Sequence, residues 1–365
     1  MNRIIIILLS LIPIICNAMN VEEFNQPYPY GMEMKDNPNF TGAAWIYPLS
    51  HDKALNVPMF NVTFEPGCRN SWHSHTGGQI LIATAGVGYY QEKGKPARRL
   101  FPGDIVEIAP NVVHWHGAAP DSWFAHIAIE CNPENNQVTW LDPVNNEEYT
   151  EATKNMEVIT DLTPGQQAIV AIASYAAVGD KEGLSRALSQ GLDSGLTVNE
   201  IKELLIQVYA YCGFPRSLTA LGVFNGVLTD RKAVGINDPE SEAATPVSDI
   251  DKYGQGAKML SELSGIPEDA PAPWYEQFAP GINTFLKEHL FCDIFGRGVL
   301  TNTDREIGTV SMLTALGGVE PMAMGHIAIC RHLGVSTPQL NALLDIIQWN
   351  MGPAKVEPIR KIVNQ

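Results

Sequence analysis

Residues 66–86 have the sequence PGCRNSWHSHTGGQILIATAG, in which His73 and His75 alternate and Gln79 follows four residues after the second histidine. Side chains at positions i and i+2 of a β-strand point to the same face, so both imidazoles can enter one side of a sheet. The turn-forming residues Thr76-Gly77-Gly78 then allow the next strand to bring Gln79 back beside them. This stretch therefore predicts three converging metal ligands inside a β-structure.

A second stretch, residues 102–118, has the sequence PGDIVEIAPNVVHWHGA and supplies a fourth ligand. Its strand pattern ends in a turn at Pro110-Asn111, and Asn111 tolerates the left-handed conformation that such turns often need. Beyond the turn, His114 can reach the same interior. Three imidazoles and one amide oxygen form a neutral set that leaves a cation its full charge as a Lewis acid, which favours Mn²⁺ or Fe²⁺ and leaves Zn²⁺, Ni²⁺ and Co²⁺ open. The alternative is a group of buried, hydrogen-bonded histidines without metal.

Short runs rich in β-branched and aromatic residues, separated by Gly, Pro and Asn, occupy residues 56–130: MFNVTF, QILIATAGVGYY, DIVEIA and WFAHIAIE. This spacing predicts an all-β barrel or sandwich, which we place at residues 40–145. Phe60 and Val62 share one strand face, and if that face is inward they are candidate substrate-binding residues, with Phe60 large enough to narrow the pocket. His116 shares a face with His114, and His126 lies in the last run; each is either a general acid or base or a core histidine satisfied by a backbone partner.

After residue 150 the pattern changes to long helical periods such as TVNEIKELLIQVYAYCG, with Thr197 placed as an N-cap. We expect an all-α region built as a tandem repeat: a first copy at 150–236, a linker at 237–273 with one short helix near residues 258–263, and a second copy at 274–365. Aligning the copies places Gln167 opposite Glu306 and Ala187 opposite His326. Only the second copy therefore has ionisable groups at both positions.

The two β-rich stretches resemble the paired motifs of the cupin superfamily, G-x5-H-x-H-x3-E/Q-x6-G and P-G-D-x4-P-x-G-x2-H, over about residues 57–130. Gln79 stands where most cupins have Glu, and the second motif departs at Ala109 and Asn111 without losing a ligand. Gln79 together with HWHGA and HIAIE is similar to small manganese-binding cupins that include bacterial hydroxynitrile lyases. In them, His116 and His126 would correspond to histidines beside the metal that do not bind it.

The helical half resembles the carboxymuconolactone decarboxylase family, which shares the alkylhydroperoxidase-like fold, over about residues 162–352. Peroxidase-type members carry a CxxC dithiol between the Glu and the His, but here those positions are Gly318 and Pro321. Glu306 and His326 remain as candidate catalytic residues, with Arg297 as a possible clamp for a substrate carboxylate. The alternative is a buried Glu–His hydrogen bond that only stabilises two helices. Met312, Met322 and Met324 are expected to fill the core.

The net charge of −16 argues against a nucleic-acid partner, because phosphate binding needs clustered Lys and Arg. Arg3, the apolar run at residues 4–15 and Cys16-Asn17-Ala18 predict a signal peptide at residues 1–18, hence a periplasmic or secreted protein that is not inserted in a membrane after cleavage. The five remaining cysteines show no dense framework and are expected to be free. By analogy with related helical domains, we expect a homo-oligomer.

These observations predict an exported, metal-dependent enzyme of lyase or decarboxylase type that acts on a small oxygenated organic molecule. A second hypothesis is a non-catalytic module that binds metal or ligand on an oligomeric helical scaffold. A third is a peroxiredoxin-like antioxidant protein of the alkylhydroperoxidase-like fold.

Overall fold

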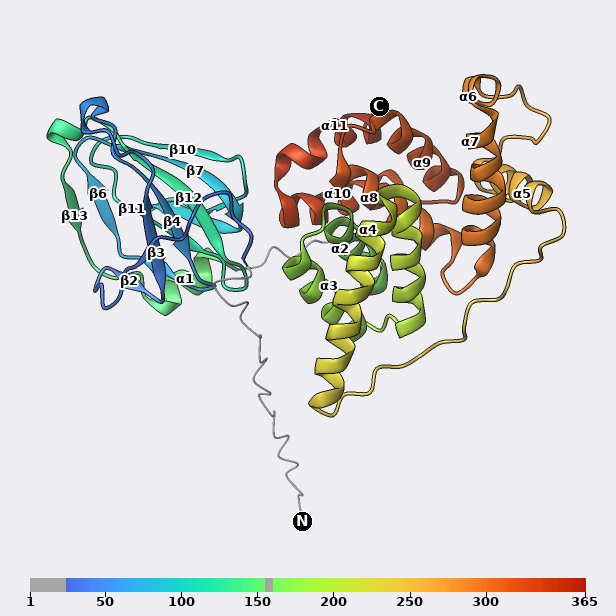
Figure 1. Ribbon diagram of the computed structural model, residues 1–365, viewed down its shortest axis with the longest axis horizontal. Coiled ribbons are helices and arrows are strands. Elements are labelled where there is room, and N and C mark those ends of the chain that lie inside the picture. The colour runs from blue at the N-terminus through green and yellow to red at the C-terminus, as the bar shows by residue number, and fades with distance from the viewer. Residues whose placement is uncertain (1–23, 155–159) are drawn as a thin grey trace, which may run out of the picture. The chain divides into compact units, whose positions relative to one another are not determined.

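The computed structural model describes residues 24–154 and 160–365, and the predicted signal peptide lies outside these described residues. Contacts divide the chain into two compact units, residues 1–154 and 155–365, and each has its own hydrophobic core. The first unit is rich in strands and the second in helices (Figure 1). The predicted fold class, a β-barrel followed by an all-α region, is therefore confirmed.

The first unit consists of two antiparallel sheets. One sheet has the strand order β1-β3-β4-β12-β7-β10, and the other has the order β13-β6-β11-β5-β2, with β8 pairing to β11 and β9. The strands are β1 (Met32–Glu33), β2 (Phe40–Thr41), β3 (Ala44–Pro48), β4 (Met59–Phe64), β5 (Arg69–Asn70), β6 (His73–His75), β7 (Gln79–Gly86), β8 (Gly88–Glu92), β9 (Arg98–Leu100), β10 (Ile105–Ile108), β11 (His114–Ala118), β12 (Phe124–Glu130) and β13 (Val138–Trp140). Short 3-10 turns, η1 (Lys53–Leu55) and η2 (Pro133–Asn135), and helix α1 (Asn146–Ala152) complete the unit.

The core of the barrel follows the alternation of its strands. Along β7, every second side chain from Gln79 to Ala85 is buried, because successive residues of a strand face opposite sides of a sheet. The buried face of β7 meets the apolar side chains of β4, β10 and β12, among them Val62, Val106 and Phe124. The inward face of β7 is thus apolar except at Gln79, and this end of the strand is where the polar candidate ligands lie.

Two turns fix the directions of the candidate ligands. Gly78, between β6 and β7, has φ +83°, and a Cβ there would lie 2.8 Å from the carbonyl oxygen of Ile108, so only glycine fits. Asn111, before β11, has φ +64°, as the sequence predicted, and its N–H donates to the carbonyl oxygen of His75 at 2.8 Å. The second turn is therefore tied to the strand that carries the first two histidines.

The helical unit is a bundle in which α2 packs against α4 and α8. The helices are α2 (Pro164–Val178), α3 (Lys181–Asp193), α4 (Val198–Ala233), α5 (Lys252–Ser264), α6 (Trp274–Phe278), α7 (Pro280–Phe285), the π-helical segment η3 (Leu286–Ile294), the 3-10 turn η4 (Phe295–Arg297), α8 (Asn302–Leu316), α9 (Glu320–His332), α10 (Thr337–Met351) and α11 (Pro353–Val363). Within the described ranges, no helix is both long enough and apolar enough to cross a membrane.

The internal repeat is visible in the caps and kinks of the helices. Thr197 caps α4 in a capping box, as predicted, and Ser336, its counterpart in the alignment, caps α10 in the same way. Gly213 interrupts α4 with φ 82° and ψ 160°, and Gly352 ends α10 with φ 90° and ψ 161°. Equivalent positions in the two copies therefore adopt the same conformation.

The helix expected near residues 258–263 is longer than the sequence suggested. Helix α5 begins after Asp251, whose side chain accepts a hydrogen bond from the Gly254 N–H, and it ends at Gly265 in the left-handed conformation. These two capping residues extend the helix in both directions beyond its apolar core.

Candidate functional site

The three histidines predicted as metal ligands lie together inside the barrel. His73 on β6 and His114 on β11 are direct cross-strand partners, and their ring centroids are 4.1 Å apart. The ring of His75 lies 5.2 Å from that of His73 and 5.8 Å from that of His114. All three side chains are at least nine-tenths buried, as is Gln79 at the start of β7. Strand pairing thus brings together residues that are about forty positions apart in the sequence.

Backbone carbonyl groups orient two of these imidazoles. The Nδ1 atom of His73 lies 2.9 Å from the carbonyl oxygen of Ser71, and Nδ1 of His114 lies 3.0 Å from that of Val112. Because a carbonyl oxygen only accepts, each Nδ1 carries the hydrogen and each Nε2 presents its lone pair. A histidine that binds a metal through Nε2 and donates a hydrogen bond from Nδ1 adopts this tautomer.

Several acceptor atoms in this group are buried without a hydrogen-bond partner among the described residues. They are Nε2 of His75, Nε2 of His114 and Oε1 of Gln79. Buried polar atoms normally have partners, so orphaned acceptors on neighbouring side chains fit a site that binds a cation. Together with Nε2 of His73, these atoms fit a neutral, four-ligand site for a divalent ion.

His116 also lies within reach, since ligand atoms of His73, His114 and His116 are all within 4.8 Å of one another. Both of its ring nitrogens, however, have protein partners. The Asn70 side chain accepts from the His116 backbone N–H at 2.9 Å, which fixes the amide so that its Nδ2 donates to Nε2 of His116 at 3.0 Å. Nδ1 of His116 therefore carries the hydrogen and donates to Nε2 of His126 at 3.1 Å. His116 fits a hydrogen-bonded histidine pair better than a metal ligand.

Burial makes all five imidazoles poor bases. It lowers the pKa of His114 to about 4 and that of His126 to about 3. Burial also lowers the pKa of His73, His75 and His116, with neighbouring imidazoles adding to the effect on His73 and His116. The rings are accordingly neutral at neutral pH, which is the state that can bind a metal.

The apolar side of the site is formed by β4. Val62 is the cross-strand partner of His126, and Phe60 is the partner of Ala128, so both predicted substrate-binding residues share the face of β12 that carries His126. The ring of Phe64, on the same face, lies 5.6 Å from that of His126. Phe60 and Val62 thus line the interior beside the histidine pair.

Three polar neighbours of the site were missed in the sequence. Besides Asn70, these are Glu92, the cross-strand partner of His114, and Glu130, the cross-strand partner of Gln79. Burial raises the pKa of Glu130. The position of Glu130 opposite Gln79 depends on strand register, which the sequence pattern does not give.

In the helical unit, the structure brings Glu306 and His326 together. Nδ1 of His326 on α9 donates to Oε2 of Glu306 on α8 at 2.7 Å. Glu306 is fully buried, whereas the His326 side chain is 14% exposed. The ring of Tyr211, from the first copy, lies edge-on to the His326 ring at 5.4 Å. With Nδ1 bonded to the carboxylate, Nε2 of His326 is the atom that can accept a proton.

Arg297 does not join this pair but binds Glu203 through two nitrogens, at 3.0–3.2 Å. The expectation that three methionines fill the core was wrong for two of them: Met312 is buried, but Met322 and Met324 are more than half exposed.

The described cysteines are all free, as expected. Burial raises the pKa of Cys68, Cys212, Cys292 and Cys330. Raised values keep these thiols protonated and poorly reactive, since the thiolate is the nucleophile.

Comparisons with known proteins agree with the division of the chain into a barrel unit and a helical unit. Residues 60–125 match the cupin domain family, and residues 147–225, in the first helical copy, match the carboxymuconolactone decarboxylase family. The chain is 45% identical over 112 residues to the (R)-mandelonitrile lyase of Granulicella tundricola, which covers 30% of this chain and 85% of that protein. A crystal structure of a cupin-like protein from Thermotoga maritima shares 48% identity, with 36% of this chain and all of that chain covered and a TM-score of 0.35.

The similarity to the mandelonitrile lyase covers most of that protein but less than a third of this chain. This chain belongs to the cupin family through its N-terminal barrel, and behind that barrel residues 147–225 match the carboxymuconolactone decarboxylase family model.

Proposed function

We propose that this protein is a metal-dependent lyase whose barrel acts on a small oxygenated organic molecule. The observation that carries the proposal is the set of buried acceptor atoms without partners: His75 Nε2, His114 Nε2 and Gln79 Oε1. Together with His73, these residues would hold the ion. Nitrogen and amide-oxygen ligands suit Mn²⁺ or Fe²⁺, and Zn²⁺, Ni²⁺ and Co²⁺ are the alternatives.

A divalent ion in such a neutral site polarises a carbonyl, carboxylate or hydroxyl oxygen as a Lewis acid. The chain's own contribution would be the histidine pair. His116 Nδ1 donates to His126 Nε2, which leaves the hydrogen of neutral His126 on Nδ1, an atom that is buried and has no partner among the described residues. His126 could donate a hydrogen bond from this N–H to a substrate oxygen in the barrel, while Phe60 and Val62 keep water away from the face beside it.

The relative named as a mandelonitrile lyase supports lyase chemistry, and cyanohydrins are therefore one candidate substrate class. Because Phe60 is a large side chain on the inner face, we expect it to leave a narrower pocket than a small residue at this position would. Lactones and hydroxy acids complete the set of candidate substrates.

The Glu306–His326 pair supports a second, separate proposal. Glu306 holds the Nδ1–H of His326, so that Nε2 can act as a base on an organic acid or lactone at this partly exposed histidine in the middle of α9. The buried pair is equally able to serve as a link between α8 and α9, and a variant decides between these roles.

The test is turnover by the purified full-length chain, metal-free and reloaded with Mn²⁺ or Fe²⁺, on cyanohydrins, lactones and hydroxy acids. We expect turnover that needs metal, is lost in His114→Ala and survives in His326→Gln. Turnover lost in His326→Gln alone would assign the reaction to the helical unit. Saturable binding without turnover would favour the ligand-binding module, and consumption of alkyl hydroperoxide with a dithiol donor would favour the antioxidant protein.

A further inference from the structure

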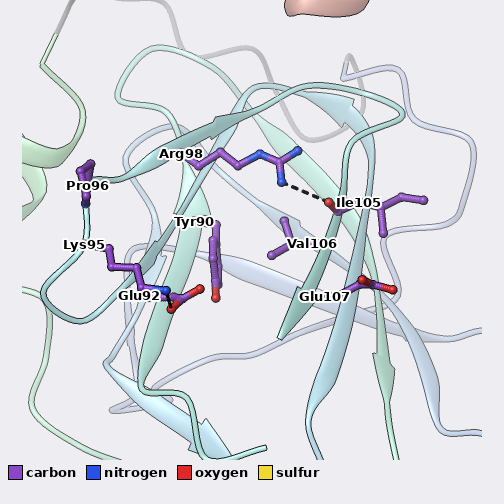
Figure 2. Close-up of a pocket in the computed structure, with 8 residues that line it drawn as sticks. All are labelled: Tyr90, Glu92, Lys95, Pro96, Arg98, Ile105, Val106 and Glu107. Atoms are coloured by element: carbon purple, nitrogen blue, oxygen red, sulfur yellow. Dashed lines mark hydrogen bonds and ion pairs between the residues drawn. The ribbon is translucent and has the colours of Figure 1, made fainter. Parts of the chain in front are cut away.

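A cavity of about 610 Å³ lies where the two sheets of the barrel part, between β10 on one side and β8 and β9 on the other (Figure 2). It is lined by Tyr90, Glu92, Lys95, Pro96, Arg98, Ile105, Val106 and Glu107. Arg98 spans the gap, because its Nη1 donates to the carbonyl oxygen of Ile105 on the opposite strand at 3.2 Å. We call this space the seam cavity.

Strand register places the seam cavity next to the candidate metal ligands. On β8, Glu92 is the cross-strand partner of His114, and on β10, Ile108 is the cross-strand partner of Gln79. Cross-strand partners point to the same face of a sheet. The two strands that border the seam cavity are therefore the direct neighbours of two of the four ligands, one from each sheet.

Tyr90 separates the seam cavity from His114. Its side chain is 6% exposed, and its ring centroid lies 5.7 Å from that of the His114 imidazole. The Tyr90 hydroxyl is buried without a well-aligned hydrogen-bond partner in the described part of the chain. Burial raises the pKa of the phenol, and the nearby Glu92 carboxylate, itself paired with Lys95, raises it further through its charge and as a hydrogen-bond acceptor. Burying a hydroxyl without a good partner destabilises a fold, so phenylalanine would fill this position better if only the shape of the ring mattered.

The charges around the seam cavity are already neutralised. Lys95 pairs with Glu92 at 2.5 Å, and Arg98 lies 3.5 Å from Asp104 in addition to its bond to Ile105. Two cations and two carboxylates line the space, so their formal charges cancel. The seam cavity thus offers one unused hydrogen-bond donor and no unused cation.

We propose that the seam cavity is the entry port of the metal site, and that the Tyr90 hydroxyl donates a hydrogen bond to the oxygen of an uncharged alcohol or carbonyl compound bound there. This inference rests on the proposed metal-dependent function. Tyr90 would then determine specificity, favouring substrates that place an oxygen acceptor between the port and His114.

The experiment measures binding of the uncharged probe mandelamide to the metal-loaded full-length chain by calorimetry, with metal content and melting temperature determined for every variant. Tyr90→Phe should weaken binding about fivefold to tenfold, the effect of one neutral hydrogen bond. It should retain metal and melt at the same or a higher temperature, because an unpaired hydroxyl has been removed. Tyr89→Phe, which removes a hydroxyl from the opposite face of the same strand, should bind like the wild type.

A second pair of variants tests the port itself. Ile105→Trp, at the half-exposed rim of the seam cavity, should abolish mandelamide binding, whereas Met32→Trp, at an exposed position on β1, should not. The inference is overturned if the metal-loaded wild type does not bind mandelamide, or if Tyr90→Phe or Ile105→Trp binds it as well as the wild type does. A lower melting temperature of Tyr90→Phe would also overturn it, because it would show that the hydroxyl already has a partner in Glu92. A chain that takes up no metal overturns the proposed function as well.

Discussion

At the scale of single residues, hydrogen bonds assign different tasks to neighbouring histidines. His73 and His114 each donate from Nδ1 to a backbone carbonyl oxygen and keep Nε2 free, whereas His116 is held at both nitrogens by Asn70 and His126. Proximity alone would group His116 with the ligands. The arrangement of donors and acceptors separates the candidate ligands from a histidine pair whose one remaining donor is the Nδ1–H of His126.

Burial of His126 predicts a pH-dependent stability. Its pKa is lowered to about 3 in the folded protein, against about 6.5 in an unfolded chain. The unfolded state therefore binds the extra proton first, and stability is lost as the pH falls from about 6.5 towards 3. In metal-free protein, the unfolded chain of His126→Asn takes up one proton fewer than that of the wild type. The free energy of unfolding should therefore fall less steeply with decreasing pH, by about 1.4 kcal/mol per pH unit between about pH 6 and 4.

Urea unfolding of the metal-free chain at several pH values, followed by tryptophan fluorescence, measures this slope. His51→Asn, which replaces an exposed histidine of the same unit, should leave the slope unchanged. Equal slopes in the wild type and His126→Asn would show that this imidazole is not buried in its neutral form.

The sequence was informative about residues where local geometry decides. The alternation of His73 and His75, the return of Gln79 after two glycines and the left-handed turn at Asn111 all follow from short-range rules. Asn70, Tyr90 and Glu92 were not found, because their roles depend on which residues of β5, β8 and β11 stand opposite one another. Register is a long-range property that no single strand encodes.

At the scale of elements, a buried ionic group links the two helical copies. Arg305 on α8 is fully buried, and its guanidinium bonds Glu203 and Gln207 on α4 and the carbonyl oxygen of Gly298. Arg297 binds the same Glu203 carboxylate. The sequence suggested Arg297 as a clamp for substrate, but this partner lies ninety-four positions away and could not be anticipated from spacing.

We predict that Glu203→Gln destabilises the helical unit by about 3–5 kcal/mol, because it leaves the Arg305 charge buried without a counterion. Glu262→Gln, at an exposed pair with Lys258, should change stability by less than about 1 kcal/mol. Denaturant unfolding followed by circular dichroism measures both. Similar decreases in the free energy of unfolding of the two variants would mean that the buried ionic group stabilises the helical unit no more than a surface ion pair does.

Elements were predicted best where periodicity and caps agreed. The N-cap at Thr197 and the run MFNVTF, which forms β4, were located from sequence. The length of α5 was underestimated because its ends depend on Asp251 and Gly265 rather than on apolar spacing. Helix α1 was not predicted: it crosses the expected boundary between the barrel and the first helical copy, and its Tyr149 hydroxyl donates to the carbonyl oxygen of Ala118 on β11 at 2.7 Å.

At the scale of the whole molecule, the chain combines two units with separate cores and separate polar sites. The barrel contains the cluster of imidazoles, and the helical unit contains the Glu306–His326 pair. Variants in one unit should therefore leave the chemistry of the other intact. This independence is what allows the metal site to be tested in the full-length protein.

The most direct test of the central claim is the metal content of the purified full-length chain and its single variants, measured by elemental analysis after dialysis. The account predicts one divalent ion per chain in the wild type and in His116→Asn, and loss of most of the metal in His73→Ala, His75→Ala and His114→Ala. Retention of metal by His75→Ala with its loss from His116→Asn would contradict the assignment of ligands. A wild-type chain that binds no divalent ion would contradict the account as a whole.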